Sequence, residues 1–157
     1  MKKINIRIIP YLLLAAMLLP VSCHKCDMKK NIGLQLYSLR DSMRTNPVKT
    51  VQEAAKIGFT FVEPAGYSEG RFYGMPPAEF KALIENNGMV IISSHTGMAV
   101  PDSANWDSVM QWWDKCIAAH AELGVKYIVQ PFMDSVGTQS LAGLQRYCDY
   151  FNAVGEK

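Results

Sequence analysis

The fold is decided by residues 46–64, which read NPVKTVQEAAKIGFTFVEP. Asn46 is a residue type that caps helices, and Pro47 suits the first helical turn. Apolar residues then recur at helical spacing, and Gly58 allows the left-handed backbone that ends a helix. The residues at 59–62 are aromatic or β-branched, as in a buried strand. This stretch therefore predicts a helix followed by a strand, which is the repeating unit of an α/β protein.

The same cycle of helix and strand recurs along the chain. Strands are predicted at residues 32–39, 59–62, 89–93 and 125–129, and helices at 47–57, 77–87, 106–123 and 141–154. Four consecutive units of similar length imply a parallel sheet with right-handed crossovers. Because the strands are apolar with little alternation, we expect both faces of the sheet to be buried. On the last helix, the expected inward face consists of Leu141, Leu144, Cys148, Phe151 and Val154.

Two architectures fit such a sheet: a doubly wound open sheet and a (βα)8 TIM barrel. A doubly wound sheet usually carries a glycine-rich phosphate loop after its first strand. The corresponding residues 37–41 read YSLRD, and no glycine-rich nucleotide motif occurs elsewhere. We therefore expect the barrel. Since a complete barrel needs at least about 200 residues, the 157 residues would form its first four βα units, a half barrel.

The N-terminus has the pattern of an export signal. An uncharged run over residues 8–19 follows three basic residues, Lys2, Lys3 and Arg7. The run is shorter than the roughly 20 residues of a spanning helix, which makes a transmembrane helix the weaker interpretation. The next residues, Leu19-Pro20-Val21-Ser22-Cys23, resemble the lipobox of bacterial lipoproteins, with Pro20 as a departure from its usual leucine.

We therefore expect a signal peptide over residues 1–22, lipidation of Cys23, a tether over residues 23–31 and the half barrel over residues 32–157. Ordinary signal cleavage is the alternative. The protein would be exported and anchored to a bacterial membrane, in the periplasm or at the cell surface. Removal of the signal takes three of the sixteen basic residues and leaves thirteen against fourteen acidic ones, a net charge of −1. No basic patch then argues for nucleic acid, whose binding neutralises several phosphates.

The chain has four cysteines, and export would place them in an oxidising compartment. Cys23 and Cys26 form a C-x-x-C pair, but they lack the preceding strand or second ligand pair of a redox or zinc motif. We interpret Cys26 as part of the tether. Cys116 and Cys148 fall at apolar helical positions and are expected to be buried thiols, with a disulfide between them as the alternative.

Polar residues interrupt the predicted strands at their carboxyl ends, where parallel α/β folds place their sites. The four candidates are Gln35, Glu63, His95 and Gln130. Glu63 and Gln130 each precede a proline, which holds the preceding residue extended and marks where a strand leaves the sheet. We expect these four side chains to line a preorganised pocket.

Each candidate also has a purely structural alternative. Glu63 could be a solvated rim carboxylate, and His95 could be a hydrogen-bonded structural imidazole. Gln35 and Gln130 could satisfy loop backbone groups. His120, in the middle of a predicted helix, is expected to lie outside the site.

Aromatic residues near this edge could also contact a ligand. Tyr67 and Phe72, in the loop after the second strand, are the better candidates for lining a pocket. Trp106 begins the third long helix, where packing against the sheet is expected. A stacking platform for sugars is the alternative for Trp106.

Several of these residues occur in strings that resemble a known family. The strings are Ile32-Gly33-Leu34-Gln35-Leu36-Tyr37-Ser38-Leu39-Arg40, Gly58-Phe59, Val62-Glu63, Ser94-His95 and Tyr127-Ile128-Val129-Gln130-Pro131. Together they resemble the xylose-isomerase-like TIM barrel family, and more narrowly its sugar phosphate isomerases/epimerases. The resemblance runs from about Ile32 to the end of the chain, and the opening string is its most specific part.

The resemblance implies a sugar isomerase/epimerase that uses a divalent metal: manganese, magnesium, cobalt or zinc. The metal would polarise a sugar carbonyl while a carboxylate moves a proton at the adjacent carbon. In the family, the metal ligands and catalytic glutamates come chiefly from the fifth to eighth strands. No metal ligand or catalytic residue is therefore assigned in this chain, and only Glu63 and His95 fall at positions that commonly face the substrate. We expect this segment to be inactive alone.

Two other functions stay open at this point. One is a lyase or hydrolase of oxidised (3-keto) glycosides on the same barrel, and the other is a non-catalytic sugar-binding remnant. The endonuclease branch of the fold is disfavoured because the mature chain is slightly acidic. The open strand edges of a half barrel would also favour association, so we expect a homo-oligomer or poor solubility.

Overall fold

The computed structural model describes residues 31–157. The predicted signal peptide, the lipidation at Cys23 and Cys26 lie outside the described residues, as does the predicted tether except for Asn31. In the described part of the chain, no helix is long and apolar enough to cross a membrane.

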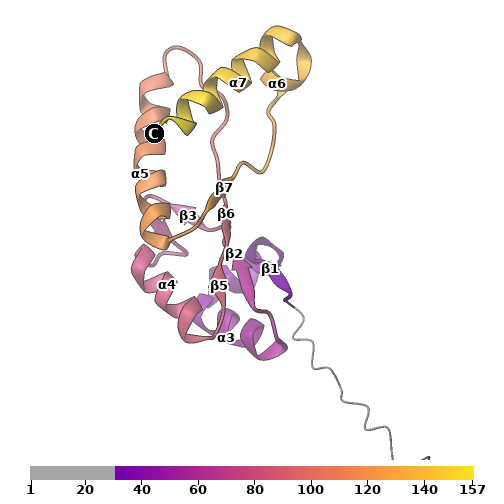
Figure 1. The fold of residues 1–157 in the computed structure, drawn as a ribbon, viewed down its shortest axis with the longest axis vertical. Coiled ribbons are helices and arrows are strands. Elements are labelled where there is room, and N and C mark those ends of the chain that lie inside the picture. Colours follow the sequence, from indigo (N-terminus) through magenta and orange to yellow (C-terminus); the bar gives the residue numbers. More distant parts are fainter. Residues whose placement is uncertain (1–30) are drawn as a thin grey trace, which may run out of the picture. The chain divides into compact units, whose positions relative to one another are not determined.

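Five of the strands pair in parallel and follow one another in chain order (Figure 1). Strand β1 (Gly33–Gln35) pairs with β2 (Phe61–Glu63), which pairs with β5 (Val90–Ile91), and β6 (Ser93–His95) pairs with β7 (Tyr127–Val129). The two groups are joined because the N–H of His95 donates to the carbonyl of Pro64 at 2.8 Å. A sheet that grows in chain order has no switch point, which confirms the barrel-type α/β architecture over the doubly wound one.

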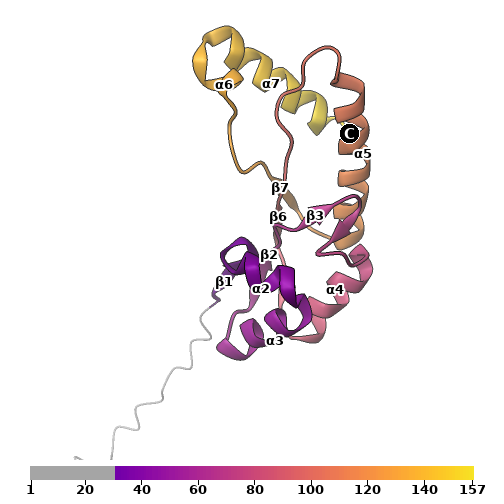
Figure 2. The ribbon, with the colours of Figure 1, turned by 180° about the vertical axis from the view of Figure 1, so that it is seen from behind.

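Helices alternate with these strands. They are α2 (Arg40–Thr45), α3 (Pro47–Ile57), α4 (Pro77–Asn86), α5 (Trp106–Leu123), α6 (Ser135–Gln139) and α7 (Leu141–Gly155). A 3-10 turn, η2 (Leu36–Leu39), precedes α2. The strands β3 (Tyr67–Ser68) and β4 (Arg71–Phe72) form a separate hairpin. Figure 2 shows α2 beside α3.

The predicted helix boundaries are confirmed by their caps. Asn46 accepts a hydrogen bond from the N–H of Lys49 at 3.0 Å, and Ser140 accepts one from the N–H of Gly143 at 3.0 Å. Gly58 ends α3 with a φ of 108°, where a side chain would be strained.

The first strand is shorter than predicted. Residues 32–39 were expected to be extended throughout, but only Gly33–Gln35 are, and Leu36–Leu39 form a 3-10 turn. Leu36 is fully buried, so the turn carries this side chain into the core. The chain thus leaves the sheet at Gln35 and passes through this turn into α2.

The core has two clusters of buried side chains. The first contains Leu36, Met43, Val51, Val62, Phe72, Phe80, Ile84, Met89, Ala119 and Leu123. The second contains Val100, Val109, Met110, Trp113, Cys116 and Tyr150. Helix α5 contributes to both clusters, and Figure 1 shows it with α4 on one side of β5, β6 and β7.

The prediction that both faces of the sheet are buried is wrong for the described residues. Val90 is 55% exposed and Tyr127 is 63% exposed. The helices cover one face, where Val62 is fully buried. The other face carries these exposed apolar side chains.

The predicted inward face of α7 is also wrong in part. Leu141 is 87% exposed, Leu144 is 40% exposed, and Cys148 is exposed rather than buried. The helix is instead oriented by Tyr150, whose large ring is fully buried and whose hydroxyl accepts a hydrogen bond from Trp113 on α5 at 2.5 Å. Phe151 and Val154 do pack against the second cluster, as predicted. Both Cys116 and Cys148 are free thiols, so no disulfide joins them.

Candidate functional site

Glu63 is the centre of a hydrogen-bond network at the carboxyl end of the sheet. Its Oε1 accepts a hydrogen bond from the Nε2 of Gln35 at 2.7 Å. Its Oε2 accepts a short hydrogen bond from the hydroxyl of Ser93. The register of the sheet explains the first contact, since Gln35 and Glu63 are paired residues on β1 and β2. The carboxylate is thereby held in place while both oxygens keep lone pairs for a ligand.

His95 is the last residue of β6 and lies beside this network. Its backbone N–H bonds to Pro64, the residue after Glu63. Its ring is half-buried and meets the ring of Tyr37 edge-on, with centroids 6.0 Å apart. The structure thus places His95 at the same edge as Gln35 and Glu63, with Tyr37 beside it.

Gln130 occupies a different environment from the other candidates. Its Nε2 donates to the carbonyls of Phe132 at 3.1 Å and Met98 at 3.3 Å. A Cβ on Gly97 would lie 1.5 Å from the Oε1 of Gln130, so the amide fills the space beside that glycine. Gln130 therefore ties the loop after β6 to the end of β7, which is the structural alternative considered for it.

The two aromatic residues expected to line a ligand pocket belong to the core. Phe72 is fully buried, and the ring of Tyr67 packs against it at 5.5 Å between centroids. Both rings lie against His120, at 5.0 Å from Tyr67 and 4.9 Å from Phe72. Trp106 is half-buried and packs against Tyr150 of α7, with centroids 6.0 Å apart, rather than against the sheet as predicted.

His120 lies in the interior, outside the Glu63 network. Its Nδ1 is 2.6 Å from the carbonyl oxygen of Cys116, and its Nε2 is 2.9 Å from the hydroxyl of Ser94. Burial lowers the pKa of His120, although the hydrogen bond to Cys116 acts in the opposite direction. The arrangement suits a neutral imidazole that donates from Nδ1 and accepts at Nε2. His120 therefore satisfies polar groups between α5 and β6.

A cavity of about 440 Å³ opens at the same edge of the sheet. Its lining includes Tyr37, Arg40 and Arg44 from the segment after β1, and Gly66 and Tyr73 from the segment after β2. Tyr37 connects this cavity to His95. A larger cavity of about 680 Å³ lies against α2 and α3, and none of the predicted site residues lines it.

Sequence reasoning missed Ser93, Arg44 and Tyr73. Ser93 could have been predicted, because its hydroxyl group lies at the end of a predicted strand. No sequence pattern identifies Arg44 or Tyr73 as a site residue, since their positions depend on the conformations of the segments after β1 and β2. The site residues Gln35, Glu63 and His95 do come together, as their positions at strand ends predicted.

The described residues do not form a metal centre by themselves. No group of three or more histidine, cysteine, aspartate or glutamate side chains is close enough to hold an ion within residues 31–157. Glu63 uses both oxygens for Gln35 and Ser93. A metal would need further ligands.

The strand order and the polar edge define the class: a parallel α/β chain of barrel type with its site at the carboxyl ends of the strands. The family described as "Xylose isomerase-like TIM barrel" matches residues 51–157. The chain belongs to this family. No curated protein matches the chain significantly.

Solved structures place the chain among sugar phosphate isomerase/epimerase-like folds. It is 29% identical to a sugar phosphate isomerase/epimerase from Parabacteroides distasonis, with a TM-score of 0.72 over 80% of this chain and 49% of that one. A second such protein from the same organism is 27% identical, with a TM-score of 0.63 over 80% of this chain and 46% of that one. The chain also shares its fold with a xylose isomerase domain protein from Alicyclobacillus acidocaldarius. The identity is 16%, and the TM-score is 0.50 over 76% of this chain and 44% of that one. The chain spans about half the length of these proteins.

Proposed function

We propose that this protein serves in the isomerisation or epimerisation of a sugar, by proton transfer next to a carbonyl. The observation that carries the proposal is the Glu63 carboxylate, fixed by Gln35 and Ser93 at the carboxyl end of the sheet. A carboxylate in a fixed position can accept hydrogen bonds from sugar hydroxyls or receive a proton from a carbon acid. The likeness to sugar phosphate isomerases/epimerases supports the same substrate class.

The described residues have defined roles in this proposal. Glu63 accepts hydrogen bonds from the sugar with its free lone pairs, and Gln35 orients Glu63 from the neighbouring strand. His95 and Tyr37 form an adjoining wall of two aromatic rings. A divalent cation would supply polarisation of the carbonyl, but the described residues do not provide the ligands to hold such an ion. We therefore expect the described residues to bind sugar without turning it over.

Calorimetric binding to the full chain tests the site. Fructose should bind, and Glu63→Gln should weaken binding about tenfold, since a hydrogen bond to a charged group contributes about 1.5–3 kcal/mol. The matched control is Glu85→Gln, which removes the same charge at an exposed position on α4 and should change nothing. Equal effects of the two variants would contradict the site.

Two further measurements separate the related functions. Tighter binding of a 3-keto-disaccharide than of fructose would favour the lyase or hydrolase alternative. Deuterium incorporation next to the carbonyl in D2O would reveal turnover. Turnover by this chain would contradict its expected inactivity.

We also propose that the protein is exported and anchored by a lipid on Cys23. The support is the sequence pattern of residues 1–23. Expressed in a bacterium with labelled palmitate, the protein should carry label and enter the membrane fraction, and Cys23→Ser should abolish both. Cys26→Ser is the matched control and should keep both. Retention of label in Cys23→Ser would exclude this anchor.

A further inference from the structure

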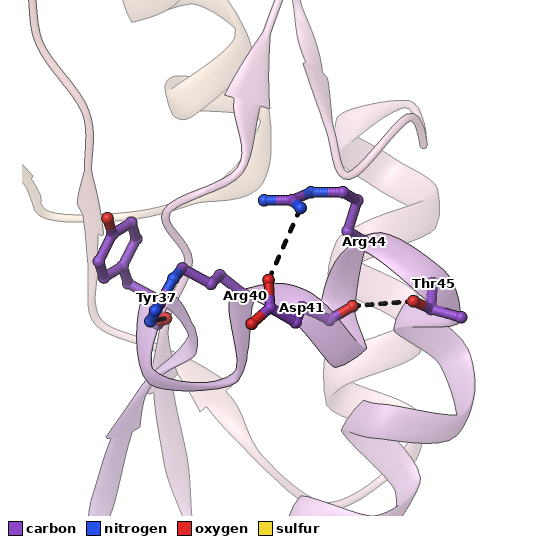
Figure 3. A network of polar contacts seen from close by, with 5 residues as sticks. All are labelled: Tyr37, Arg40, Asp41, Arg44 and Thr45. Carbon is purple, nitrogen blue, oxygen red and sulfur yellow. Dashed lines mark hydrogen bonds and ion pairs between the residues drawn. The ribbon is translucent and has the colours of Figure 1, made fainter.

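The segment after β1 places two arginines on one face of a short helix. Arg40 and Arg44 are four residues apart on α2 (Figure 3), and both line the same cavity. The residues that line that cavity include both arginines and no aspartate or glutamate. An electropositive cavity at a strand edge attracts negatively charged ligands.

We propose that this cavity binds the anionic group of a charged sugar, a phosphate or a carboxylate, through Arg40 and Arg44. This inference rests on the proposed function for the sugar that carries the anion. Arginine is suited to the role because its planar guanidinium presents paired N–H groups that match two oxygens of either anion.

Within the described residues, neither arginine forms a buried ion pair or a strong hydrogen bond. Arg44 lies 3.6 Å from Asp41, but the two side chains are 78% and 80% exposed. An exposed pair of this kind contributes little, so an anion in the cavity can replace Asp41 at small cost. Figure 3 shows this pair, together with the bond from the hydroxyl of Thr45 to the carbonyl of Asp41.

Arg40 is oriented by Tyr37. Its guanidinium carbon lies 5.0 Å from the centroid of the Tyr37 ring, a cation–π contact, and one N–H donates to the Tyr37 carbonyl at 3.4 Å. The remaining N–H groups are available to a ligand. Because Tyr37 also touches His95, Arg40 is linked to the edge that carries Glu63. A sugar at Glu63 could thus carry its charged group toward Arg40.

Tyr73, from the segment after β2, lines the same cavity and offers a further donor. Its hydroxyl accepts a hydrogen bond from the N–H of Ala65 at 2.9 Å, and burial raises its pKa to about 12, so its proton stays in place. Its φ of 51° is a left-handed conformation that a bulky residue rarely adopts. Gly66 makes room for it, since a Cβ there would lie 2.3 Å from the Tyr73 ring. Such strain persists only where the surroundings hold it, and here it accompanies the placement of Tyr73 in the cavity lining.

Calorimetry on the full chain at low ionic strength provides the test. The probes are inorganic phosphate, fructose 6-phosphate, glucuronate and fructose. We expect one or both charged sugars to bind at least about tenfold more tightly than fructose, with the advantage shrinking as salt is added. A preference for fructose 6-phosphate identifies a phosphate, and a preference for glucuronate identifies a carboxylate.

Substitutions assign the effect to the cavity. Arg44→Gln should reduce the affinity for the preferred anion about threefold to tenfold, and the double variant Arg40→Gln/Arg44→Gln should abolish the preference for it. Tyr73→Phe, which removes only the hydroxyl, should reduce affinity about twofold to fivefold. Lys115→Gln is the matched control, because it removes one positive charge from an exposed position on α5. Thermal melting of each variant checks that it folds.

The outcomes separate this inference from the proposed function. An anion preference that survives in the folded double variant, or equal binding of charged and neutral sugars, overturns the anion site. Binding of fructose that depends on Glu63 would then leave the proposed function standing. Arginine-dependent binding of phosphate without any binding of sugars would support the anion site and contradict the proposed function.

Discussion

The Nε2 of His120 lies 2.9 Å from the hydroxyl oxygen of Ser94, and both side chains are buried. One residue comes from the last turn of α5 and the other from the middle of β6. The contact therefore fastens a helix to a strand by a polar bond inside an otherwise apolar layer. A neutral imidazole completes it at both ring nitrogens.

This contact predicts that acid destabilises the fold. Burial lowers the pKa of His120 in the folded state, so the unfolded state takes up the proton more readily. The free energy of unfolding should be highest above about pH 6.5 and should fall below that pH, by at most about 1.4 kcal/mol per pH unit for one proton. Urea unfolding between pH 5 and 8 measures the slope, and NMR titration of the His120 ring gives its pKa directly. A ring that titrates at or above pH 6.5 would contradict the prediction.

Removing the hydroxyl of Tyr150 should destabilise the second core cluster. In Tyr150→Phe, the indole N–H of Trp113 loses its acceptor in a buried position. An unsatisfied buried donor costs about 1–3 kcal/mol. Denaturant unfolding followed by tryptophan fluorescence measures the change. Tyr127→Phe, at a residue 63% exposed, is the matched control and should stay within about 0.5 kcal/mol of the wild type.

Gly97→Ala should cost about 1–2 kcal/mol of stability by displacing the amide of Gln130 from its two hydrogen bonds. If Gln130 is first replaced by Ala, the added methyl group meets no amide, and its cost should nearly vanish. A double-mutant cycle in urea measures this coupling. Gly155→Ala, where a Cβ meets nothing within 4 Å, is the neutral control. Additive effects would show that the two residues are independent.

The two described cysteines should differ sharply in reactivity. Cys148 is exposed, whereas Cys116 is fully buried and its burial raises the thiol pKa to about 12. Iodoacetamide should modify Cys148 in the native protein at pH 8 and Cys116 only after unfolding, because the thiolate is the reactive form. Mass mapping of the labelled peptides distinguishes them. Rapid labelling of Cys116 in the folded protein would contradict its burial.

The limits of most helices could be predicted from the sequence, because caps and apolar periodicity depend on residues that are close together in the chain. The helix at 106–123 was predicted at its observed limits, and Asn46 and Ser140 cap as expected. The position of Glu63 beside Gln35 followed from strand ends alone.

Features that depend on long-range packing were not predicted. The orientation of α7 depends on the contact between Tyr150 and Trp113, which are 37 residues apart. The role of Gln130 depends on the missing side chain at Gly97, whose place its amide takes. Tyr73 enters the cavity lining through a backbone conformation that its residue type disfavours.

The division of the core has a consequence for synthesis on the ribosome. Every residue of the first cluster precedes Gly124, whereas the second cluster cannot close before Tyr150 has emerged. The N-terminal units can thus condense while later residues are still being added, which is the order in which nascent chains generally fold. Because α5 contributes Ala119 and Leu123 to the first cluster and Trp113 to the second, it would be docked early and would then act as a template for α7.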